Sequence, residues 1–183
     1  EEGQPHFALR VERQVQSVDA GSSVSMKEWT HLAGVVTGDK KLKIYINGEL
    51  AATDTTGGLV AADPNEAMQV GGDQGSPVGH YSGGKTFNGA LDEVRIYREA
   101  LEKDALRKLS SRADQPPQTD AEPVLYYGFD DGKPRDLSGH ENHGSGGGEA
   151  VDGVFGRALR ISGPSYPDYY EGKRRWTRRI PFY

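Results

Sequence analysis

One polar stretch, DLSGHENHG at residues 136–144, has the residue types of either a tight turn or a metal site. In a turn, Asp136 and Ser138 would accept backbone N–H groups, while Asn142 and His143 would fix the loop to its neighbours. In a metal site, carboxylate, amide and main-chain oxygens would bind Ca²⁺, which prefers oxygen ligands. Turn chemistry alone accounts for every residue type in the stretch, so the sequence does not require a metal ion there. The sequence does not exclude one either, and both interpretations stay open.

A second acid, Asp92, lies where a carboxylate is costly. In LDEVRIY, residues 91–97, a simple pleat places Asp92 on the same face as the apolar residues that follow it. An inward carboxylate must be hydrogen-bonded or ligated. One solution is a hydrogen-bonding partner, and the other is a single Ca²⁺ shared by Asp92, Asp130 and Asp136. The sequence therefore gives these three acids as candidate metal ligands and Ca²⁺ as the candidate cofactor.

Catalytic arrangements known to need a local signature are missing from the sequence. Retaining glycoside hydrolysis uses two carboxylates about 5–5.5 Å apart. The adjacent acids at 92–93 and 130–131 would point to opposite faces of a strand, and no Glu-x-Asp-x-x-Glu run occurs. There is no Gly-x-Ser-x-Gly elbow, and the absence of cysteine excludes a Cys nucleophile and disulfides. We therefore expect a noncatalytic protein.

Aromatic side chains in Gly- and Pro-rich stretches offer a different chemistry, because rings stack on sugar faces. Such stretches occur at residues 79–89 and 165–176. The density of Tyr near the carboxyl end favours binding slightly over ordinary surface exposure. The candidate ligand-binding residues are Tyr81, Tyr166, Tyr169, Tyr170 and Trp176.

Composition narrows the class of protein. The 183 residues suffice for one sizeable core, and no apolar run approaches the roughly 20 residues of a membrane span. A net charge of −5 argues against nucleic-acid binding, which needs clustered cations. The exception is KRRWTRR at residues 173–179, which we interpret either as an edge strand or as a contact for an acidic surface. The chain begins with neither Met nor a signal peptide, so we expect a processed or excised piece that has lost any targeting segment.

The elements that must position these residues are mostly strands. KLKIYINGELAAT, residues 41–53, alternates apolar and polar residues around an Asn-Gly turn, which predicts a hairpin with one solvent face. Further strands are predicted around residues 6–12, 16–20, 29–37, 67–72, 91–98 and 123–130. One helix is predicted over residues 98–112, and the polar stretch 113–123 is expected to be a linker. Many short strands with regular turns indicate a sandwich or barrel.

Two stretches carry a family resemblance. EWTHLAGVVTGDKKLKIYINGELAAT, then MQVGGD, then FNGALDEVRIYREAL resembles the second half of a laminin-G-like domain of the concanavalin A-like lectin/glucanase superfamily. VLYYGFDDGKPRDLSGHENHGSGGG followed by GVFGRALRISG resembles the first portion of such a domain. The halves are thus in reversed order. Residues 124–183 would either complete the sandwich of residues 1–112, which burial of apolar surface favours, or begin a second tandem domain. If they complete it, the strand at residues 124–130 should pair with the strand at residues 91–97.

The resemblance implies a fold and a function. The expected fold is all-β, a concanavalin A-like jelly-roll sandwich of antiparallel strands with one short helix near residues 98–110. The expected function is a noncatalytic carbohydrate-binding or adhesion module of an exported bacterial protein, at the cell surface, outside the cell or in the periplasm. The alternative is a structural or assembly module that mediates protein–protein contacts, and a less favoured one is a glycan hydrolase or lyase, because the superfamily includes such enzymes. Expected partners are a glycan or a protein surface, including other domains or subunits of a larger assembly, and not nucleic acid.

Overall fold

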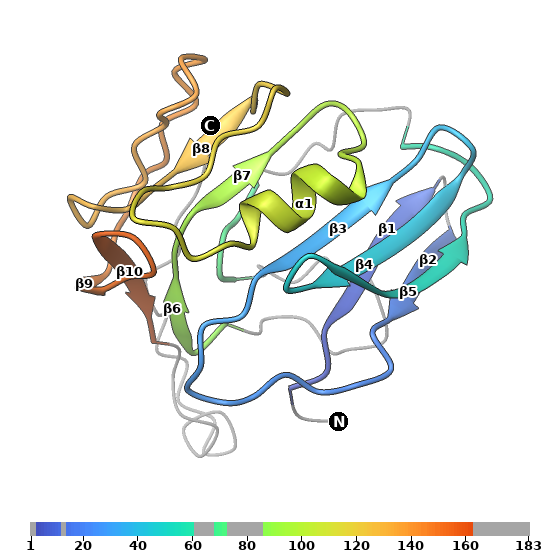
Figure 1. The fold of residues 1–183 in the computed structure, drawn as a ribbon, viewed down its shortest axis with the longest axis horizontal. Helices are drawn as coiled ribbons and strands as arrows, with labels where there is room; N and C mark the ends of the chain where they lie inside the picture. The colour runs from blue at the N-terminus through green and yellow to red at the C-terminus, as the bar shows by residue number, and fades with distance from the viewer. Residues whose placement is uncertain (1–2, 12–13, 61–67, 73–85, 163–183) are drawn as a thin grey trace, which may run out of the picture. The chain divides into compact units, whose positions relative to one another are not determined.

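The structure is a computed structural model that describes residues 3–11, 14–60, 68–72 and 86–162 (Figure 1). Its described elements are antiparallel strands and one short helix, which confirms the predicted all-β class. No helix among these residues is long and apolar enough to cross a membrane. In chain order the elements are β1 (His6–Val11), β2 (Gln14–Asp19), β3 (Leu32–Val36), β4 (Lys41–Ile46), β5 (Glu49–Thr55), β6 (Gly89–Leu91), β7 (Val94–Ile96), α1 (Lys103–Leu109), β8 (Leu125–Tyr127), β9 (Glu149–Asp152) and β10 (Arg157–Ile161).

The chain forms two compact units. Of the residues that the structure describes, unit 1 contains 3–11, 14–60 and 97–122, and unit 2 contains 68–72, 86–96 and 123–162. Unit 1 therefore holds β1 to β5 and α1, and unit 2 holds β6 to β10.

Unit 1 is built from hairpins that are local in sequence. β1 pairs with β2, and β3, β4 and β5 form a three-stranded antiparallel sheet (Figure 1). The apolar residues of β4 that alternate along the strand, Leu42 and Ile44, are buried with Leu9 and Val18 of the β1–β2 pair. Two-residue periodicity thus selects the face of β4 that becomes core.

The turn of the β4–β5 hairpin is the predicted Asn-Gly turn. Asn47 and Gly48 both have positive φ, at 50° and 78°. The N–H of Asn47 donates to the His31 carbonyl at 2.8 Å, and its side-chain Oδ1 accepts the His31 N–H at 3.0 Å. The turn is therefore fixed to the residue that precedes β3, as well as by its own conformation.

The other face of this hairpin differs from the prediction of a solvent face. Tyr45 is buried there with Val35 and with Leu106 of α1, so the helix covers part of the face. α1 is also shorter than the predicted helix over residues 98–112. Its few residues place a single fully buried side chain, Leu106, on the sheet, and this tertiary contact rather than a long periodic pattern defines it.

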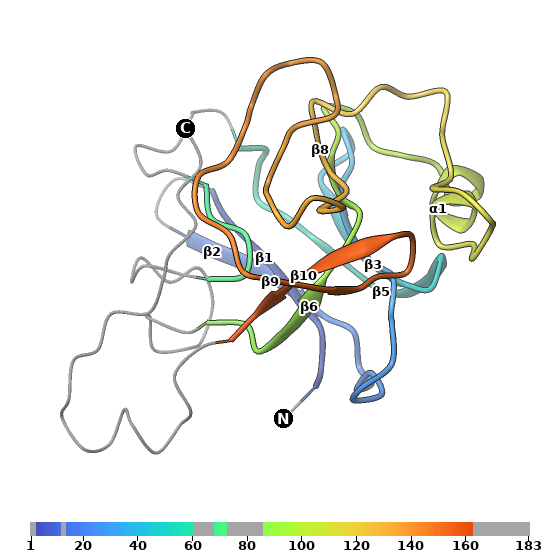
Figure 2. The ribbon, with the colours of Figure 1, turned by 90° about the vertical axis from the view of Figure 1, so that its left-hand side faces the viewer.

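Unit 2 joins strands that lie far apart in sequence. β10 pairs with β6 on one side and with β9 on the other (Figure 2), while β7 pairs with β8. In the β7–β8 pair, Val94 lies opposite Tyr127 and Ile96 opposite Leu125. This confirms the prediction that the strand after the linker pairs with the strand near residues 91–97. The buried core of the unit consists of Leu125, Tyr127, Phe129, Leu159 and Ile161.

Candidate functional site

Charged and polar side chains of unit 2 gather where residues 92–95, 126–130 and 153–157 meet. Two non-glycine residues there have positive φ, Glu93 at 54° and Phe129 at 58°. Each is next to an acid that points at the β9–β10 turn, Asp92 or Asp130. Left-handed backbone at non-glycine residues costs free energy and is concentrated at sites that need a fixed geometry. This cluster is therefore the candidate functional site.

Asp92 is half-buried and accepts hydrogen bonds from backbone groups of two segments. Its Oδ2 accepts the N–H groups of Val154 at 2.8 Å and Phe155 at 3.2 Å, and its Oδ1 accepts the N–H of Glu93 at 2.9 Å. Burial raises the pKa of Asp92, although these three N–H groups oppose the shift. The inward carboxylate expected from the sequence is thus satisfied by backbone donors.

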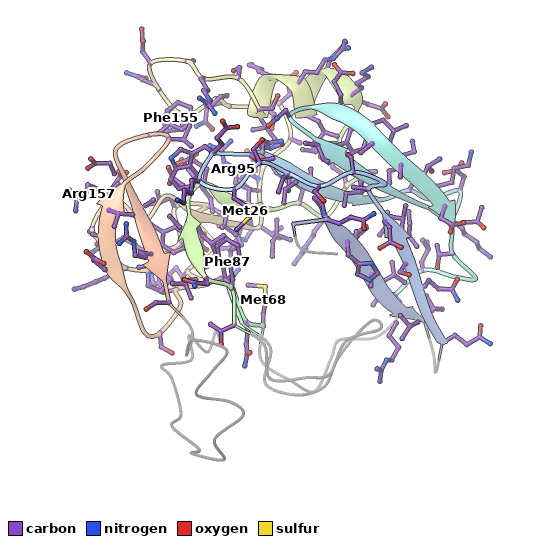
Figure 3. The ribbon with its side chains drawn as sticks, turned by 90° about the horizontal axis from the view of Figure 1, so that it is seen from below. Met26, Met68, Phe87, Arg95, Phe155 and Arg157 are labelled. Atoms are coloured by element: carbon purple, nitrogen blue, oxygen red, sulfur yellow. The ribbon has the colours of Figure 1, made fainter. Side chains whose placement is uncertain are left out.

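Asp130 is bound to the same turn from the other side. Its Oδ1 accepts the N–H of Arg157 at 2.9 Å, immediately after the turn. Gly156 has a φ of 56°, and a Cβ at that position would collide with the Asp130 carboxylate. Two carboxylates, one preceding β7 and one following β8, therefore hold the β9–β10 turn and the first residue of β10. Figure 3 labels Phe155 in this turn and Arg157 at the start of β10.

Glu93, Arg95 and Tyr126 form the second part of the cluster. Arg95 donates to Glu93 Oε2 at 2.6 Å, and the Tyr126 hydroxyl lies 2.9–3.0 Å from both Glu93 carboxylate oxygens. The Arg95 guanidinium also lies over the Tyr126 ring, 4.3 Å from its centroid. Burial raises the pKa of Glu93 and raises the pKa of Tyr126 to about 12. The group is a largely buried ion pair completed by a neutral phenol.

The DLSGHENHG stretch is a turn organised by Asp136. Its Oδ1 accepts the N–H groups of Tyr126 and Ser138 at 3.0 Å, and its Oδ2 accepts the Asn142 N–H and the Ser138 hydroxyl at 2.9 Å. Burial would raise the pKa of Asp136, but these donors outweigh it and lower the pKa. His143 accepts the N–H of Asp136 through Nδ1 at 3.1 Å. The turn interpretation of Asp136, Ser138 and His143 is confirmed.

The three candidate calcium ligands do not all bind the same segment. Asp92 and Asp130 bind the β9–β10 turn, whereas Asp136 binds its own loop and β8. N–H groups point at oxygens of all three carboxylates, which is the reverse of what a cation requires. Within the described ranges, no three His, Cys, Asp or Glu side chains are grouped so that they could hold a metal ion. This geometry favours hydrogen bonding, and calcium binding stays a prediction.

We compared the sequence and the structure of the chain with those of known proteins to find its family. The family model of the concanavalin A-like lectin/glucanases superfamily matches residues 1–107, more than half of the chain. The chain belongs to this superfamily. No curated protein matches it. Among solved structures, an S-layer domain-containing protein (residues 221–444) from Clostridium thermocellum ATCC 27405 is 24% identical with a TM-score of 0.35. The match covers 60% of this chain and 52% of that one, about half of its length.

The superfamily match ends before residues 123–162, which supply most of the candidate site. Of the sequence-derived candidates, Asp92 and Asp130 are brought together at one turn, and Asp136 is not part of that contact. Sequence reasoning missed Glu93, Arg95 and Tyr126. The two-residue spacing of Glu93 and Arg95 was the available signal, but the partner Tyr126 lies across a strand pairing that no local pattern reveals. The basic stretch at residues 173–179 lies outside the described residues. So do the aromatic candidates, which remain predictions: Tyr81, Tyr166, Tyr169, Tyr170 and Trp176.

Proposed function

We propose that this superfamily member is a noncatalytic carbohydrate-binding or adhesion module of an exported bacterial protein, acting at the cell surface, outside the cell or in the periplasm. The observation that carries the proposal is the match of a lectin-type family model to residues 1–107. The absence of cysteine from the sequence is compatible with either side of a membrane, so the location rests on the family alone.

The candidate site supports a binding role over a hydrolytic one. A catalytic acid must hold a proton within reach of the substrate oxygen. Asp92 directs its carboxylate at backbone N–H groups, and Glu93 is engaged by Arg95 and the Tyr126 hydroxyl. These contacts use the carboxylates to fix loops. Fixed loops with exposed side chains are what a binding rim needs, because little conformational entropy is then lost when a ligand binds.

Sugar contacts are proposed for the aromatic candidates Tyr81, Tyr166, Tyr169, Tyr170 and Trp176. A ring buries apolar area against the face of a pyranose at a low cost in side-chain entropy. For a tyrosine this stacking needs the ring and not the hydroxyl, so Phe is the matched control for each Tyr→Ala substitution.

A glycan array with the full chain tests the proposal. We expect retention of a defined set of glycans, lost in Tyr170→Ala and Trp176→Ala and kept in Tyr170→Phe. An array without retention, together with stable co-purification of a protein partner, would instead support the structural or assembly alternative. Retention that is unchanged in the Ala variants would keep the lectin role and reject these residues as its contacts.

A further inference from the structure

Unit 2 takes its buried core from outside the region that the superfamily model matches. The five buried residues of this core belong to residues 125–161, whereas the match ends at residue 107. Residues 86–96 add only partly buried Leu91 and Val94. We call residues 123–162 the donor segment and residues 86–96 the acceptor segment. The acceptor strands therefore depend on a donor that follows them in sequence.

Two short ladders join donor and acceptor. β6 and β7 of the acceptor are three residues each, and they pair with β10 and β8 of the donor. Side-chain contacts make this pairing selective, because Glu93 requires the Tyr126 hydroxyl and Asp92 requires the N–H groups of the β9–β10 turn. A strand without these groups would leave Glu93 with Arg95 and Asp92 with the Glu93 N–H, and would remove the other hydrogen bonds of both carboxylates.

The connection between the two segments contains a stretch suited to act as a hinge. After α1 ends at Leu109, the residues up to the start of β8 at Leu125 form no helix or strand. This stretch includes ADQPPQTDAEP, whose prolines are compatible with an extended backbone. Ten extended residues span up to roughly 33–36 Å, enough to reach a neighbouring molecule.

We propose that the donor segment of one copy of this chain completes unit 2 of a second copy, by pairing with its acceptor segment. Every strand pairing, hydrogen bond and buried contact of unit 2 is kept when identical segments are exchanged, so the exchange needs no new interface. Within one chain the connection fixes the effective concentration of the donor, whereas exchange between chains depends on the protein concentration, so the share of the exchanged form grows with protein concentration. The partner is thus a second copy of the chain, and the exchange is independent of any glycan ligand.

Single cysteines test this exchange, because the chain contains none of its own. Ala90 of the acceptor lies opposite Arg160 of the donor, at a separation that allows a disulfide in an antiparallel pair. The full chains Ala90→Cys and Arg160→Cys are mixed, refolded together at several concentrations and oxidised. The matched control is a mixture of Asp152→Cys and Arg157→Cys, whose positions are partners within the donor segment and stay in one chain on exchange.

We expect a disulfide-linked heterodimer of Ala90→Cys and Arg160→Cys, identified by mass, whose share rises with concentration. The control mixture should give only the small amount of heterodimer that forms when the cysteines of two separate molecules collide at random. Removing residues 114–121 should increase the Ala90→Cys/Arg160→Cys product, because a short connection prevents closure within one chain. Equal yields in the two mixtures, or no product at any concentration, would overturn the proposal and leave the glycan-binding proposal untouched.

Discussion

The two units differ in how the strands around their buried cores are paired. Unit 1 joins neighbours in sequence, with a hairpin turn that positions Asn47 and Gly48 at positive φ. Unit 2 joins strands separated by α1 and the linker, and fixes its turns with the carboxylates of Asp92, Asp130 and Asp136. Local pairing needs only turn chemistry, whereas distant pairing needs side chains that recognise the backbone of the incoming segment.

Removal of everything after Arg112 should have the largest effect. The fragment loses the partners of β6 and β7 and all five buried residues of unit 2, which leaves apolar surface and strand edges in water. We expect it to be insoluble or molten, measured by near-UV circular dichroism and dye binding. A fragment that unfolds cooperatively would contradict the dependence of the acceptor strands on the donor segment.

Asp136→Asn should cost about 1.5–3 kcal/mol of the free energy of unfolding at pH 7, because a charged acceptor of several hydrogen bonds is lost. The pKa of Asp136 is lowered from 3.8, so its contribution is present above about pH 3.8 and is lost as the pH falls through the folded value. Urea titrations of both proteins should therefore converge in acid. A constant difference down to pH 2 would show that the charge is not what stabilises the loop.

Gly48→Ala should destabilise unit 1 by at least about 1 kcal/mol, because the residue has a φ of 78° and an added Cβ would lie 2.6 Å from Ser110 Oγ. Gly57→Ala is the matched control, since nothing lies within 4 Å of its Cβ position. Thermal unfolding of the two variants measures the difference. Equal melting temperatures would mean that the turn conformation does not limit the stability of unit 1.

Asp92→Asn should behave oppositely to Asp136→Asn in its pH dependence. Burial raises the pKa of Asp92 above its ordinary value of 3.8. The wild-type protein therefore loses stability as the pH rises from 3.8 through the pKa of the folded state, because the buried carboxyl becomes ionised. The amide oxygen of Asn can still accept N–H groups, so the variant should lose less than about 1 kcal/mol at pH 7. Urea titrations from pH 3 to 7 test this, and a wild-type advantage that grows with pH would refute it.

Calcium offers the smallest expected effect. If Asp92, Asp130 and Asp136 share an ion, millimolar Ca²⁺ raises the melting temperature, EDTA lowers it and Asp92→Asn abolishes the response. The same melting temperature in Ca²⁺ and EDTA would leave the three acids with hydrogen-bonding roles alone.

The contrast between local and distant strand pairing also explains which features could be predicted from the sequence. The β4–β5 hairpin was predictable because alternation and an Asn-Gly pair are local signals. The pairing of residues 91–97 with 124–130 was reached through the family resemblance and the need to bury apolar faces, not through any local pattern. Glu93 and Tyr126 were missed because their contact exists only after that distant pairing. Covering of Tyr45 by α1 was missed for the same reason, since periodicity does not show which face a helix will bury.

Hydrogen exchange of a matched pair of core variants tests the central claim most directly. Leu42 in unit 1 and Leu159 in unit 2 are both fully buried, and each Leu→Ala change should cost about 2–5 kcal/mol. We predict that Leu159→Ala accelerates amide exchange in both the donor segment and acceptor residues 89–96, whereas Leu42→Ala accelerates it first in residues 41–55. Residues 89–96 that keep their protection in Leu159→Ala would contradict the claim that the donor segment completes unit 2.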